Sequence, residues 1–165
     1  MKRIDDIRGM DVISLKSDVN LGKIRDVLID TSSQQIIGYT ISESDFFTGD
    51  KGIFIYDINT IFCDAVIIRT ARTLKKIKSI TRRKSNITQF EEIKNLSVTN
   101  SKGETIGNLS YLLFDPLNGH IKALVLQGNL IITLRNQEII IHSKSIIVSS
   151  SIKGKDQRKK SNKLF

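Results

Sequence analysis

Short apolar runs alternate with polar turns along most of this chain. The run LGKIRDVLID at residues 21–30 follows a polar turn and ends at an aspartate, and a second run, IIGYTIS, begins at residue 36. Runs of this length that are rich in Ile and Val and bounded by Gly, Asn, Asp and Ser are typical of β-strands. The pattern therefore predicts an all-β chain.

The same phrase occurs twice in the chain. The run IGNLSYLLFD at residues 106–115 repeats the pattern of residues 21–30 at an offset of 85 positions, and upstream the offset becomes 86. We expect the offset of 85 to hold without a gap from residue 21 to 62. It then pairs residues 53–56 with 138–141, and 60–62 with 145–147. We interpret this as two copies of one module of about 60 residues.

Each copy is expected to form a small antiparallel barrel of about five or six short strands, because closure removes exposed strand edges. Gly22 and Gly107 precede the long strand of each copy, where glycine permits a bulge or a positive φ. Asp30 and Asp115 end that strand. A turn aspartate that accepts a backbone N–H explains these two carboxylates better than a ligand-binding role does.

The order of these features resembles the PRC-barrel family, which includes the photosynthetic reaction-centre H subunit and the C-terminal half of the ribosome-maturation factor RimM. The first copy carries the resemblance in GMDVISLKSDVNLGKIRDVLIDTSSQQIIGYTIS and GIFIYDINTIFCDAVII, across residues 8–68. The second, across residues 93–150, departs from the pattern, with Ala123 in place of Gly38 and HSKSI in place of YDINTI. The resemblance implies a fold that docks to other macromolecules, and it does not imply an enzyme.

The net positive charge is concentrated in two short segments outside the two modules. Residues 69–88 contain eight Lys or Arg and no Asp or Glu, and residues 153–165 contain six basic residues and one acidic residue. Leu74, Ile77 and Ile80 recur every three residues, which permits a short amphipathic helix. We therefore expect four segments: module 1 at 1–68, a basic, partly helical linker at 69–88, module 2 at 89–152, and a basic disordered tail at 153–165.

These two basic segments are the candidate anion-binding sites. Their members are Arg69, Arg72, Lys75, Lys76, Lys78, Arg82, Arg83, Lys84, Arg158, Lys159 and Lys160. Four interpretations remain open: salt-dependent binding to RNA or the ribosome, attraction to an anionic membrane surface, attraction to an acidic protein face, and a solvated linker and tail that bind nothing. The adjacent aromatics Phe46 and Phe47, in a polar loop, are candidate contacts with a protein partner. Capping of one barrel end and packing on the second copy are the alternatives for this pair.

No catalytic or metal-binding signature is visible in the sequence. His120 and His142 belong to no HxxxH or CxxC cluster, and no GxSxG or phosphate-binding glycine pattern occurs. The single cysteine, Cys63, excludes an internal disulfide and fits a half-buried apolar role better than a nucleophile. We therefore expect no enzyme activity, no cofactor and no small-molecule substrate.

The resulting expectation is a non-catalytic adaptor that docks to a macromolecular partner. The resemblance to RimM favours a ribosome- or RNA-associated partner in the cytoplasm. The resemblance to the H subunit favours a peripheral position at the inner membrane face, in assembly of a membrane complex. An enzyme whose residues only the fold brings together is the third alternative.

Overall fold

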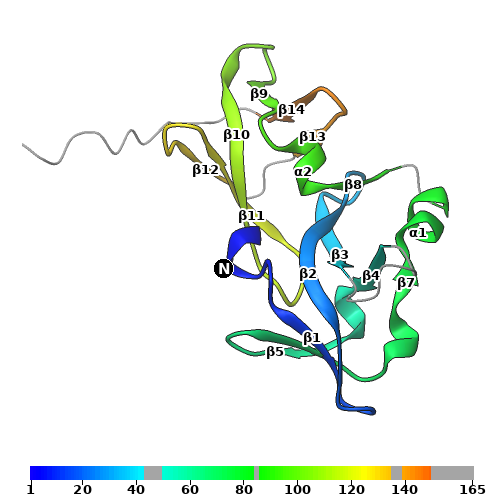
Figure 1. Cartoon of the computed structure of the whole chain (residues 1–165). Coiled ribbons are helices and arrows are strands. Elements are labelled where there is room, and N and C mark those ends of the chain that lie inside the picture. Colours follow the sequence, from blue (N-terminus) through cyan, green and yellow to red (C-terminus); the bar gives the residue numbers. More distant parts are fainter. Residues whose placement is uncertain (43–49, 84–85, 135–138, 150–165) are drawn as a thin grey trace, which may run out of the picture.

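The computed structural model describes residues 1–42, 50–83, 86–134 and 139–149, and they form two β-sheets (Figure 1). The first sheet contains β1 (Asp11–Ser14), β2 (Val19–Asp30), β3 (Gln35–Ser42), β4 (Lys51–Phe54), β5 (Ile58–Ile61), β6 (Ala65–Ile68), β7 (Lys75–Lys76) and β8 (Ile87–Gln89). The second contains β9 (Ser97–Asn100), β10 (Thr105–Phe114), β11 (Ile121–Leu126), β12 (Ile131–Thr133), β13 (Ile139–Ile141) and β14 (Ser145–Val148). The predicted all-β class is confirmed.

Among the described residues, the helical segments are short and lie before the first strand or between strands. The two α-helices are α1 (Ile77–Arg83) and α2 (Phe90–Ile93), and the 3₁₀ turns are η1 (Ile4–Asp6), η2 (Ile55–Asp57) and η3 (Ala71–Thr73). In the described part of the chain, no helix has the length and apolar character that crossing a membrane requires.

Neither sheet closes into a barrel through the strand pairs of the described residues. The first runs in the order β5-β6-β1-β2-β3-β4-β7, with β8 on β2, and the second in the order β12-β11-β10-β9-β14-β13. One pair in each sheet is parallel, β1 with β6 and β9 with β14. The expectation of closed, purely antiparallel barrels is therefore corrected: a parallel return strand covers β1, and β7 takes the free edge of β4.

The strand register of the first hairpin is the same in the two sheets. Ile13 pairs with Asn20 in the first sheet, and Thr99 pairs with Thr105 in the second, at the offsets of 86 and 85 that the sequence shows. In both sheets the register shifts next to this pair, opposite the glycine-containing start of the long strand. Both modules thus use the same bulge.

The prediction that the offset of 85 continues without a gap to residue 62 is wrong beyond β3. Phe54 pairs with Gly38, and Thr133 pairs with Ala123, so Thr133 is the equivalent of Phe54 and lies only 79 positions later. The connection before β12 is shorter than the one before β4. Alignment of the two copies did not reveal this gap, because isoleucine-rich strands match one another at several offsets.

The two modules exchange their N-terminal segments. Thr88 of β8 pairs with Ile29 of β2, and its equivalent, Lys2, pairs with Phe114 of β10, which is the equivalent of Ile29. The helical segments that follow, η1 and α2, carry matching capping boxes, in which the carboxylate of the third helical residue accepts the backbone N–H of the residue that precedes the helix. Each module therefore completes the sheet region of the other.

One hydrophobic core serves both modules. A single cluster of buried side chains contains Ile29 and Tyr39 of the first module together with Leu112 and Phe114 of the second. The Tyr39 hydroxyl donates a hydrogen bond to the carbonyl oxygen of Pro116, 2.8 Å away, at the boundary between the modules. The two modules therefore contact each other directly through a shared hydrophobic core.

Candidate functional site: a groove between the modules and a basic edge

The two repeat glycines lie against the neighbouring strand. Gly22 has a φ of +128°, and a Cβ there would lie 2.2 Å from the carbonyl oxygen of Ser42. A Cβ on Gly107 would lie 3.1 Å from Cδ1 of Leu126, on the strand equivalent to the one that Gly22 approaches. Both glycines allow two strands to approach closely, and only Gly22 has the positive φ.

The two repeat aspartates organise the turns after the long strands. Oδ1 of Asp30 accepts the backbone N–H of Ser32 at 2.9 Å, and Oδ1 of Asp115 accepts that of Leu117 at 3.0 Å. This backbone donor lowers the pKa of the Asp115 carboxyl. Both carboxylates stabilise local turns, as proposed from the sequence.

The basic segment that follows β6 is part of the first sheet. β7 pairs with β4, and β8 pairs with β2. Ile77 and Ile80 are buried, and Leu74 packs against the core, so the apolar face of the segment is docked. The predicted helix forms as α1, at one edge of the sheet (Figure 1).

This docking leaves a row of cations facing solvent, which we call the basic edge. Its members are Arg69, Arg72, Lys75, Lys76 and Lys78. Their side chains are exposed, and none of them forms an ion pair with another described residue. The backbone of Arg82 and Arg83 lies in α1.

The remaining candidates named from the sequence lie outside the described residues. They are Phe46, Phe47, Lys84, Arg158, Lys159 and Lys160. Nothing in the fold therefore bears on them.

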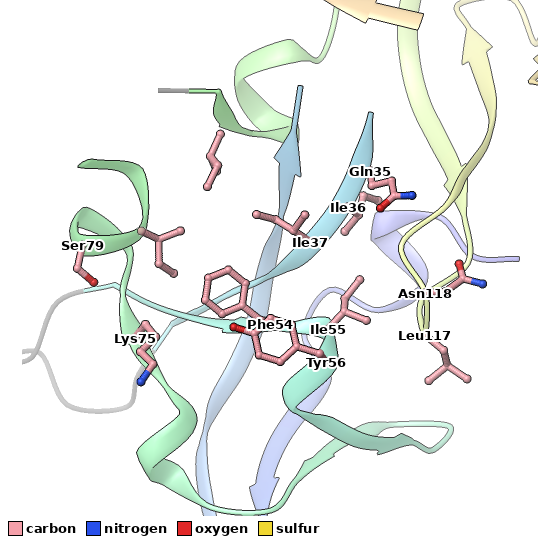
Figure 2. Close-up of a pocket in the computed structure, with 12 residues that line it drawn as sticks. Gln35, Ile36, Ile37, Phe54, Ile55, Tyr56, Lys75, Ser79, Leu117 and Asn118 are labelled. Atoms are coloured by element: carbon pink, nitrogen blue, oxygen red, sulfur yellow. The ribbon is translucent and has the colours of Figure 1, made fainter. Parts of the chain in front are cut away.

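A groove with a cavity volume of about 660 Å³ lies beside the basic edge, between the first sheet and the β10–β11 turn. Figure 2 shows its walls, with Phe54, Ile55 and Tyr56 in the centre, Lys75 and Ser79 on one side, and Leu117 and Asn118 on the other. Ile36, Ile37, Ile80 and Ile87 complete the apolar lining. We call this the inter-module groove, and no sequence motif predicted it.

A stacked aromatic pair forms the central wall of the groove. The rings of Phe54 and Tyr56 are 5.1 Å apart between centroids and nearly parallel, at 10°. Phe54 is half-buried, whereas Tyr56 is 79% exposed. Burial raises the pKa of the Asp57 carboxyl, and the nearby Lys75 opposes this rise. The groove thus combines an exposed ring with one lysine on its rim.

No group of three or more His, Cys, Asp or Glu among the described residues could hold a metal ion. His120 Nδ1 lies 3.2 Å from Gln35 Nε2, and Cys63 is exposed, contrary to its expected half-buried position. The backbone N–H of His142 closes a turn by donating to the carbonyl oxygen of Ser145.

The first sheet, with its bulged long strand and its parallel return strand, defines a small all-β module. The family model of the PRC-barrel domain matches residues 1–72, which cover the first sheet through β6 and most of η3, so this part of the chain is similar to the PRC-barrel domain. The match confirms the resemblance for the first module, and the second module is shown by its repeated strand register. A comparison with curated proteins gave no match.

Proposed function

We propose that the protein is a non-catalytic adaptor that docks to a macromolecular partner, and that this partner is RNA or an RNA-containing particle such as the ribosome. The observation that carries the proposal is the basic edge. Lys75 and Lys76 lie on β7, which pairs with β4, and Lys78 lies in α1, so the backbone that carries these three exposed cations is held on the first sheet before binding.

Phosphates are the ligands that such an edge suits. Lys and Arg that neutralise phosphates release condensed counterions, which makes RNA binding salt-dependent with a slope of about −0.7 per contact for single strands. For four or five contacts we expect the logarithm of the association constant to fall by about 3 for each tenfold rise in salt.

Fluorescence anisotropy of labelled single- and double-stranded RNA across a salt series tests the proposal. A variant with Arg69, Arg72, Lys76 and Lys78 changed to Gln should lose at least tenfold in affinity and most of the salt slope. The control changes Lys94, Lys102, Lys122 and Lys144 to Gln, which removes the same charge from exposed positions in the second module. It should retain binding.

The same proteins are then mixed with vesicles that contain phosphatidylserine. Binding to vesicles without binding to RNA would assign the basic edge to a membrane surface and overturn the RNA proposal. Equal losses in the two variants would show that only net charge matters, and would likewise contradict a dedicated basic edge.

A further inference from the structure

We propose that the inter-module groove binds a peptide segment of a partner protein, one that presents bulky apolar side chains next to Asp or Glu. This proposal rests on the adaptor role proposed above and does not require RNA as the partner, and Lys75, Lys76 and Lys78 belong to the basic edge as well. An adaptor needs a second surface, and the groove offers a chemistry different from that of the edge.

The first argument is that the apolar groups in the groove are left open to solvent. Tyr56 is 79% exposed in the centre of the groove, and Leu117 is 62% exposed on one side of it (Figure 2). Each belongs to a different module, so the packing of the modules creates the groove. Covering such side chains on binding contributes about 25 cal/mol per Å² of apolar surface removed from water.

The second argument comes from the repeat, which supplies an internal control. Ile37 lines the groove, and the equivalent residue of the second module is Lys122, which is exposed. The equivalents of the groove residues Phe54 and Leu117 are Thr133 and Ser32, both exposed and polar. The same backbone is thus built without apolar groups there, so the fold does not require them.

The third argument selects the occupant. The floor is aliphatic, which suits Leu, Ile or aromatic side chains of a peptide, and the rim carries Lys75, with Lys76 and Lys78 on the adjoining segment. Complementary charge on a partner raises its association rate and its specificity. A peptide with acidic residues beside its apolar anchors matches both parts of the groove.

Other occupants fit less well. Small-molecule sites use a few precisely placed polar groups, and the polar lining residues Gln35, Lys75, Ser79 and Asn118 are all half-buried or exposed. Single-stranded nucleic acid stacks successive bases on several aromatic rings. Tyr56 is the one exposed ring among the described lining residues.

Selection from a phage-displayed library of random 12-residue peptides, against the full chain, tests the proposal. The selected peptides should combine aromatic or aliphatic residues with Asp or Glu. A fluorescein-labelled synthetic copy should bind the Tyr56→Ser/Leu117→Ser variant at least tenfold more weakly, and Lys75→Glu should also weaken binding. Exchange of the acidic residues of the peptide for Lys should abolish it.

Phe62→Ser is the matched control, because Phe62 is an aromatic residue with 62% exposure that does not line the groove. Its affinity for the peptide should equal that of the unmodified chain. Recovery of no peptides, recovery of peptides without the apolar and acidic pattern, or equal losses in the control would overturn the proposal. So would a Tyr56→Ser/Leu117→Ser variant that loses RNA affinity and keeps peptide affinity.

Discussion

Gln35 and His120 occupy equivalent positions of the repeat, 85 residues apart, and they meet each other at the boundary between the modules. Their backbones form an antiparallel bridge, and Gln35 Nε2 lies 3.2 Å from His120 Nδ1. A contact between equivalent residues is the signature of a two-fold, isologous interface. The chain therefore has the geometry of a symmetric dimer within one polypeptide, and the exchanged N-terminal segments obey the same two-fold relationship.

The boundary depends on the absence of a side chain at Gly119. Its φ is +75°, and a Cβ there would lie 1.8 Å from the carbonyl oxygen of Ile36. Gly119→Ala should lower the free energy of unfolding by on the order of 3 kcal/mol, measured by urea denaturation. The control is Gly103→Ala, where φ is +82° but no atom lies within 4 Å of the added Cβ. It should lose only about 1 kcal/mol, and equal losses would contradict the role of the contact.

The Tyr39 hydroxyl ties the modules together through its hydrogen bond to Pro116. Burial raises the pKa of this phenol well above its ordinary value, so the hydroxyl is protonated and available as a donor at neutral pH. Tyr39→Phe should lower the free energy of unfolding by about 1 kcal/mol, the net value of one such bond. Tyr56→Phe changes an exposed hydroxyl and should be neutral.

The buried carboxyl of Asp26 links pH to stability. Its oxygens accept the backbone N–H groups of Val27 and Glu91, which connects β2 to the start of α2. Burial raises the pKa of this carboxyl above 3.8, although those donors and the Arg8 charge partly oppose the rise. The folded state therefore binds a proton at this carboxyl more tightly than the unfolded state does. Protonation thus adds to the free energy of unfolding, and this contribution is lost as the pH rises from about 3.8 through the folded pKa.

Urea titrations of the unmodified chain and of Asp26→Asn across this pH range measure the effect. The stability of the unmodified chain relative to the variant should decrease as the pH rises, because the variant lacks the titrating group. A relative stability that increases with pH would show that the hydrogen bonds outweigh burial.

The shared core predicts one unfolding transition for the described modules. Ile53 and Ile132 occupy equivalent buried positions in the two sheets. Ile53→Ala and Ile132→Ala should each cost about 2–5 kcal/mol and shift the same transition, followed by circular dichroism in urea. Two transitions, each moved by only one of the variants, would show that the modules unfold independently.

The first hairpin of each module and the turn aspartates could be predicted from the sequence, because they depend on local patterns. Strands such as β2 and β10 follow from apolar runs bounded by glycine and aspartate, and Asp30 and Asp115 then lie at predictable turns. The equivalence of Phe54 and Thr133 could not be predicted, because isoleucine-rich strands align at more than one offset and only strand pairing identifies the partner.

By itself, the sequence determined that this chain is a duplicated all-β protein with its cations gathered between and after the repeats, since strand propensity, turn chemistry and charge are properties of short segments. Only the tertiary structure decided that the modules exchange their N-terminal segments, share one core, and enclose a groove lined by Tyr56 and Leu117. These features join residues distant in the chain. Their free energy comes from packing and close approach, which local patterns do not encode.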